Sequence, residues 1–161
     1  MAAPAAAAEL FAGVLVHGVG TPATEPIYEG GADLNLGIRA APVATLWGGR
    51  IAPYLLGSVN TAGDTDFAAA GLSWEFGRGR WFARPGLGLA VHDGPHRRER
   101  NGFRTDLGSR ILFEPELSVG YRLTPRAYVE ASWVHLSHAQ WFSPQNPGLD
   151  MIGLRVGLAT R

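Results

Sequence analysis

The 161-residue sequence contains no cysteine and no lysine, and all 14 of its basic residues are arginine. Without cysteine, the chain has neither a disulfide framework nor a thiolate zinc site. Its 14 acidic residues balance the arginines, and this zero net charge gives no support for nucleic-acid binding, which requires a basic face. The sequence also lacks a run of about 20 apolar residues, which excludes a transmembrane helix. We therefore expect no nucleic-acid partner and no helical anchor.

The start of the chain, MAAPAAAAEL, lacks the basic segment and the long apolar segment of a secretory signal. We expect residues 1–8 to be a disordered remnant at the start of one domain that spans residues 1–161. Whether a signal peptide has been removed is left open.

The composition, with 22 glycines and 11 prolines among many aromatic and β-branched residues, is typical of an all-β fold with many turns. Alternating patterns predict eight strands, at residues 9–18, 31–39, 50–59, 67–76, 81–92, 111–122, 127–137 and 151–160. Short turns alternate with longer loops along the chain. This arrangement predicts an eight-stranded antiparallel up-and-down β-barrel whose N-terminus lies on the side of the short turns.

The two faces of these strands differ sharply, and the difference favours a transmembrane barrel. One face is aliphatic, as in Leu34, Leu36 and Ile38, and the other carries glycine and charge. Eight strands enclose little volume, and glycine on the inner face leaves room for large interior neighbours. We therefore expect the apolar rows to face lipid. A soluble ligand-binding barrel, with these faces exchanged, is the alternative.

Two further features support the membrane interpretation. The charged rows can neutralise one another inside the barrel, as buried charges must; they contain Arg84, Glu114, Glu116, Arg122, Glu130 and Arg155. Aromatic residues cluster near the predicted strand ends, as in the girdles of membrane barrels; they are Trp74, Phe76, Trp81 and Tyr121 on the short-turn side and Phe113 and Trp133 on the other. We expect His17 and His92, on the inner rows, to be hydrogen-bonded in the core.

The candidate site lies in the last two predicted strands and the polar loop between them. His135 and Ser137 share the apolar face of one strand, and Asp150 has the parity of the apolar face of the next. A hairpin would set Asp150 roughly opposite Ser137 and diagonal to His135, which is within side-chain reach. A serine needs an adjacent base to become a nucleophile, and the base needs an orienting acceptor. These residues therefore make a candidate Ser–His–Asp triad.

A tetrahedral intermediate also needs hydrogen-bond donors at its oxyanion. The candidates are backbone N–H groups in the stretch from His138 to Gln140 and the side chain of Asn146, and the sequence leaves the choice open. A zinc site formed by His135, His138 and Asp150 is a further alternative. It is disfavoured because residues three apart on a strand point to opposite faces.

The segment His135-Leu-Ser137-His138-Ala139, followed by Asn146-Pro147-Gly148 and Asp150, resembles the signature of the lipid A 3-O-deacylases, the PagL-like outer-membrane enzymes. The resemblance implies that His135, Ser137 and Asp150 form the catalytic triad, with Asp150 at the place of a glutamate in the best-known pattern. It also implies no cofactor, no metal and a location in the bacterial outer membrane. The implied substrate is lipid A of lipopolysaccharide, from which an ester-linked acyl chain is removed at the 3-O position.

Several alternatives remain open at this point. The chain could instead be a non-catalytic outer-membrane barrel, an adhesin or a structural protein. Five arginines, Arg97, Arg98, Arg100, Arg104 and Arg110, either contact lipid A phosphates or form an ordinary solvated loop. Trp141 and Phe142 are expected to anchor their loop at the membrane interface. A homodimer is left open.

Overall fold

The computed structural model describes residues 8–24, 28–96, 104–141 and 146–160 and contains nine strands in this part of the chain. They are β1 (Glu9–His17), β2 (Ala32–Arg39), β3 (Ala44–Leu46), β4 (Gly49–Asn60), β5 (Phe67–Arg78), β6 (Trp81–His92), β7 (Ile111–Arg122), β8 (Ala127–Leu136) and β9 (Leu149–Ala159). Eight of them match the predicted strands, each end within two residues. None of the described residues forms a helix long and apolar enough to cross a membrane.

All neighbouring strands pair antiparallel, and the sheet closes into a barrel. Its order is β2-β1-β9-β8-β7-β6-β5-β4-β3, and the pairing of β2 with β4 joins the two sides. The predicted eight-stranded up-and-down barrel is therefore confirmed. The additional strand β3 only extends the β4 hairpin beyond the barrel, through a turn at Trp47 and Gly48 where both residues have positive φ.

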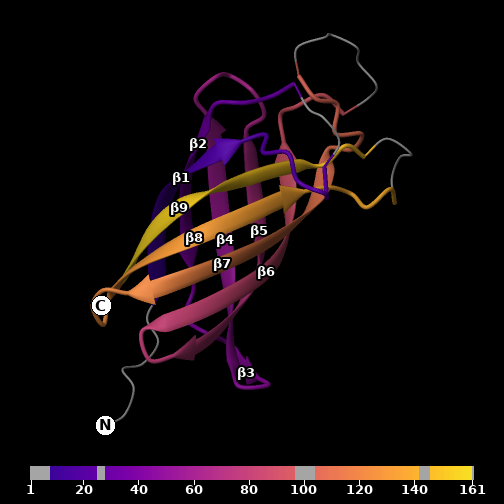
Figure 1. Cartoon of the computed structure of the whole chain (residues 1–161). Coiled ribbons are helices and arrows are strands. Elements are labelled where there is room, and N and C mark those ends of the chain that lie inside the picture. The colour runs from indigo at the N-terminus through magenta and orange to yellow at the C-terminus, as the bar shows by residue number, and fades with distance from the viewer. Residues whose placement is uncertain (1–7, 25–27, 97–103, 142–145, 161) are drawn as a thin grey trace.

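The two ends of the barrel differ as the loop lengths predict. The start of β1 and the end of β9 lie at the end of the barrel that carries the short turns and β3, whereas the longer connections gather at the opposite end (Figure 1). Antiparallel hairpins force this alternation, because every second connection returns to the same rim. The loops after β1, β6 and β8 therefore share one end of the barrel.

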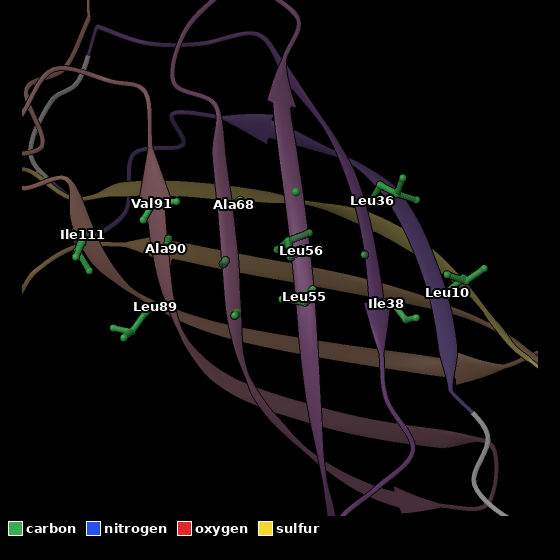
Figure 2. Close-up of a pocket in the computed structure, with 14 residues that line it drawn as sticks. Leu10, Leu36, Ile38, Leu55, Leu56, Ala68, Leu89, Ala90, Val91 and Ile111 are labelled. Carbon is green, nitrogen blue, oxygen red and sulfur yellow. The ribbon is translucent and has the colours of Figure 1, made fainter.

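The outer wall of the barrel is apolar. Leucine, isoleucine and valine side chains along the strands are 42–66% exposed, among them Leu36, Leu55, Leu89 and Ile152. Figure 2 shows such side chains standing away from the wall around a shallow apolar groove of about 890 Å³, where β4 and β5 carry glycine and alanine. An exposed apolar band of this kind is what lipid requires of a barrel, so the membrane interpretation holds and the soluble barrel is wrong.

The interior is packed with paired charges, as predicted. The Arg84 guanidinium donates to Glu130 (2.6 Å) and to Glu75, and all three side chains are buried. Arg155 donates to Glu116 (2.7 Å) and, through two nitrogens, to Asn35. The other predicted charges also have partners: Glu114 accepts from Tyr54 and Arg122 donates to Glu75. The sequence did not single out Glu9, Arg39, Glu75, Tyr54 or Tyr128 as members of this network.

Glycines on the inner face make room for these large side chains. A Cβ placed on Gly157 would run into the ring of Tyr128, and one on Gly120 would run into the ring of Phe82. The predicted role of glycine is thus confirmed.

Toward the end with the long loops, the interior becomes apolar. Buried aliphatic residues from several strands meet there, including Leu15, Leu56 and Leu112. Leu136 and Leu149, paired across β8 and β9, point into this cluster from beside the candidate site. The interior is therefore layered, and its apolar layer fixes the strand ends that carry the predicted site residues.

Replacement of Arg155 by alanine should lower the free energy of unfolding by about 3–5 kcal/mol, because the buried Glu116 carboxylate would keep only its longer contact to Arg39 (3.9 Å). Arg126→Ala, in the exposed turn before β8, is the matched control and should leave stability within about 0.5 kcal/mol. Urea unfolding of the purified barrel measures the stability of both variants. The folded fraction is read from the difference in gel mobility between the folded and the heat-unfolded barrel. Equal, negligible changes would contradict the interior assignment.

Candidate active site

The strand register places two of the predicted site residues face to face. His135 of β8 pairs directly with Asp150 of β9, one step beyond the pair Val134 and Met151. Residues on either side of His135 and Asp150 point into the barrel, so His135 and Asp150 belong to the outer face. Both are nevertheless buried, because a loop covers them.

The predicted cross-strand geometry needs one correction. Asp150 lies opposite His135, not opposite Ser137, because β9 begins at Leu149 and pairs with Leu136. Ser137 lies just past the end of β8, where its backbone exchanges two hydrogen bonds with Phe113 of β7. Ser137 therefore keeps the outer face of His135, two residues along, and is diagonal to Asp150.

The imidazole of His135 is held on both sides. Its Nδ1 lies 2.6 Å from Oδ1 of Asp150, whose side chain is fully buried. Its ring also stacks against Trp133, with centroids 5.8 Å apart. Because Nδ1 faces the carboxylate, Nε2 is left for a proton-transfer partner. Among the hydrogen bonds between described residues, none joins the hydroxyl of Ser137 to His135.

A segment from the loop after β1, residues 18–24, covers the pair; we call it the strap. The N–H of Val19 donates to the backbone carbonyl of Asp150 (2.9 Å), and the hydroxyl of Thr21 donates to Oδ2 of the same residue. Gly148, at φ 70°, lies between the strap and the imidazole of His135. A Cβ at this position would lie only 2.9 Å from Cε1 of His135 and 3.1 Å from the carbonyl oxygen of Ala23, so glycine lets the two approach each other.

The predicted oxyanion-hole candidates lie in one turn just after Ser137. Trp141 N–H donates to the His138 carbonyl (2.9 Å), and the two residues between them, Ala139 and Gln140, have positive φ of 49° and 61°. Such a conformation is costly for residues other than glycine and occurs where function or packing enforces it. Asn146 reaches this turn, since its Oδ1 accepts from the His138 N–H (3.0 Å).

The zinc alternative is not supported by the described residues. His138 is fully buried and has the parity of the interior, whereas His135 belongs to the outer face. No group of three or more histidine, cysteine, aspartate or glutamate residues in the described ranges is arranged to hold a metal ion.

His17 and His92 are buried and hydrogen-bonded in the core, as expected. His17 lies between Asp33 (2.9 Å) and Glu29 (3.0 Å), and His92 contacts the carbonyl of Ser109 (2.6 Å). Burial alone would raise the pKa of Glu29, but hydrogen bonds from His17, Thr65 and Thr105 lower it below its ordinary value.

Two predictions concern the loops: the arginine cluster and the aromatic residues Trp141 and Phe142. In the arginine cluster, Arg104 pairs with Asp93 (2.7 Å) and Arg110 is exposed, while Arg97, Arg98 and Arg100 lie outside the described residues. Trp141 is 75% exposed and packs edge-to-face on Phe113, as an interface anchor would. Phe142 lies outside the described residues.

One site residue was missed from the sequence. Thr21 lies 129 residues before Asp150, and no periodicity or motif marks it. Only the pairing of β1 with β9 brings the two together, by placing the end of β1 beside Met151.

The fold and the site together define the class of protein. The barrel has an apolar wall, an interior of paired charges and a His–Asp pair at its outer rim, and it therefore belongs with the outer-membrane barrels, a class that includes enzymes. The comparison with protein families gives the narrower assignment. The lipid A 3-O-deacylase (PagL) family matches residues 27–159, and the chain belongs to this family. The predicted family, outer-membrane location and lipid A deacylase class are thereby confirmed. No curated protein matches the chain.

Solved structures agree on the fold. The crystal structure of the outer membrane enzyme PagL superposes with a TM-score of 0.70 at 20% identity, over 94% of this chain and 99% of that one. A designed transmembrane β-barrel gives 0.55 at 11% identity, with 94% and 95% covered. Neisserial surface protein A gives 0.53 at 14% identity, with 95% and 97% covered. At these identities the likeness concerns the fold alone.

Proposed function

We propose that the protein is a serine esterase that removes the acyl chain ester-linked at the 3-O position of lipid A. The observation that carries the proposal is the 2.6 Å contact between His135 and Asp150 on the lipid-facing side, with Ser137 two residues further on the same face. Polar side chains facing lipid are expensive and usually functional. The family membership supplies the substrate class.

The proposed reaction has two halves. Oγ of Ser137 attacks the ester carbonyl of lipid A while Nε2 of His135 takes its proton. Collapse of the tetrahedral intermediate breaks the ester bond, and the lipid A hydroxyl leaves with that proton. Water then attacks the acyl-serine, again with His135 as base, and the fatty acid is released. The hydrogen bond between serine and histidine forms when substrate docks, since such contacts are often loose in the free enzyme.

Asp150 has two roles in this proposal. Its Oδ1 holds the proton of His135 on Nδ1, which leaves Nε2 free to accept the proton of Ser137. Its negative charge then stabilises the imidazolium that forms in the transition state. Both roles require an ionised carboxylate at a fixed angle to the imidazole.

For the oxyanion hole, we propose the backbone N–H of Gln140 and the side-chain amide of Asn146. The N–H of His138 already donates to Oδ1 of Asn146, and this contact turns the amide of Asn146 toward the turn. The strained conformation at Gln140 is the kind of backbone feature that aims donors at developing charge.

The place of the site suits a membrane lipid. The triad lies at the end of the barrel that carries the long loops, beside the exposed Trp141. A lipid A molecule diffusing in the outer leaflet would reach it laterally, with its acyl chains along the apolar wall. The family match gives no support for a homodimer.

Replacement of Ser137 by alanine should abolish deacylation and leave a folded, heat-modifiable barrel, because Ser137 lies past the end of β8 and its backbone bonds remain. Mass spectrometry of lipid A from cells with the wild-type protein, the variant or neither measures the loss of one ester-linked acyl chain. If wild-type cells show unchanged lipid A, a non-catalytic barrel becomes the better account. If the alanine variant still deacylates, Ser137 is not the nucleophile.

Replacement of Asp150 by asparagine should lower kcat at least about 100-fold with little change in KM, because only transition-state contacts are lost. Purified lipid A in detergent micelles is the substrate for this measurement. The control Asn35→Asp changes a buried interior residue away from the site. Wild-type turnover by the Asp150 variant would remove the carboxylate from the mechanism.

A further inference from the structure

The strap, residues 18–24, is fixed to the strand end that carries the catalytic acid. Its first contact is made by the backbone, from Val19 N–H to the carbonyl of Asp150. Its second is made by a side chain, from the hydroxyl of Thr21 to Oδ2 of Asp150. The two oxygens of the carboxylate thus have separate partners, His135 on one and Thr21 on the other.

The direction of the Thr21 hydrogen bond follows from its surroundings. The oxygen of Thr21 accepts from the N–H of Ala23 (3.0 Å), and a backbone N–H can only donate. The hydroxyl proton is therefore free for the carboxylate. Asp150 thus accepts on both oxygens, and the two contacts fix the plane of its carboxylate.

The strap is shaped around this contact. Thr24 closes a turn on Thr21, with its Oγ1 accepting from Thr21 N–H (3.1 Å) and its N–H donating to the Thr21 carbonyl (3.2 Å). Gly148 provides the space in which the strap approaches His135. The Asp150 side chain is fully buried beneath these residues, where water cannot replace a lost donor.

We propose that Thr21 is a positioning residue of the triad: its hydroxyl holds the Asp150 carboxylate in plane with the imidazole of His135. This inference rests on the proposed function, because the carboxylate needs such alignment only if His135 acts as a base. Thr21 does not touch substrate in this account. It acts through Asp150 and supplies the second hydrogen bond of the buried carboxylate.

The test compares two substitutions that differ in the hydroxyl. Thr21→Val keeps the shape and removes the donor, whereas Thr21→Ser keeps the donor. With purified lipid A, we expect Thr21→Val to lower kcat about 10- to 100-fold at an unchanged KM, the size of a buried hydrogen bond to a charge. Thr21→Ser should stay within about threefold of wild type. Equal losses in both variants would overturn the proposal.

A control separates the hydroxyl from the integrity of the strap. Pro22→Ala loosens an exposed residue of the same segment and leaves the hydroxyl in place, so it should retain wild-type kcat. A loss as large as that of Thr21→Val would mean that the strap acts as a cover, and the proposal would be wrong.

A double-mutant cycle shows whether Thr21 acts through Asp150. Once Asp150→Asn has removed the charge, adding Thr21→Val should change kcat less than twofold; a further full loss would contradict the inference. These outcomes are distinct from failure of the proposed function, which would appear as a wild-type protein without deacylase activity. An active wild type with an unaffected Thr21→Val variant rejects only the role of Thr21.

Discussion

The structure depends on one constraint: the wall of the barrel faces lipid, so the interior must hold the charges. An eight-stranded barrel has an interior just wide enough for side chains to fill, so each buried arginine and glutamate must be paired there. Arg84 with Glu75 and Glu130, and Arg155 with Glu116, meet this requirement. Glycines at Gly120 and Gly157 leave the space that the neighbouring rings need.

The same constraint marks the candidate site, which lies on the outer face of the barrel. Polar side chains beside lipid are expensive, and the His135–Asp150 pair lies at the rim where β8 and β9 end. There the strap covers the carboxylate and Thr21 supplies its second hydrogen bond. A covered acid beside a base on the outer face is what the proposed serine chemistry needs, and a membrane lipid would reach this rim from the side.

Much of this could be predicted from the sequence, because alternation at period two determines the faces of strands. Arg84, Glu116 and Arg155 were placed inside, and His135 and Ser137 outside, by parity alone. The pairing of Asp150 with His135 could not be predicted, since it depends on how many loop residues precede β9. The role of Thr21 could not be predicted for a stronger reason: its contact with Asp150 arises only because the barrel closes between β1 and β9.

The central claim is that Ser137 is a nucleophile activated by His135 on the lipid-facing wall. Labelling with a fluorophosphonate that carries an acyl chain, followed by peptide mass spectrometry, tests it directly. The account predicts a single adduct on Ser137 that disappears in His135→Ala, although Ser137 is still present in that variant. An adduct on a different serine, or equal labelling of Ser137 without His135, would contradict it.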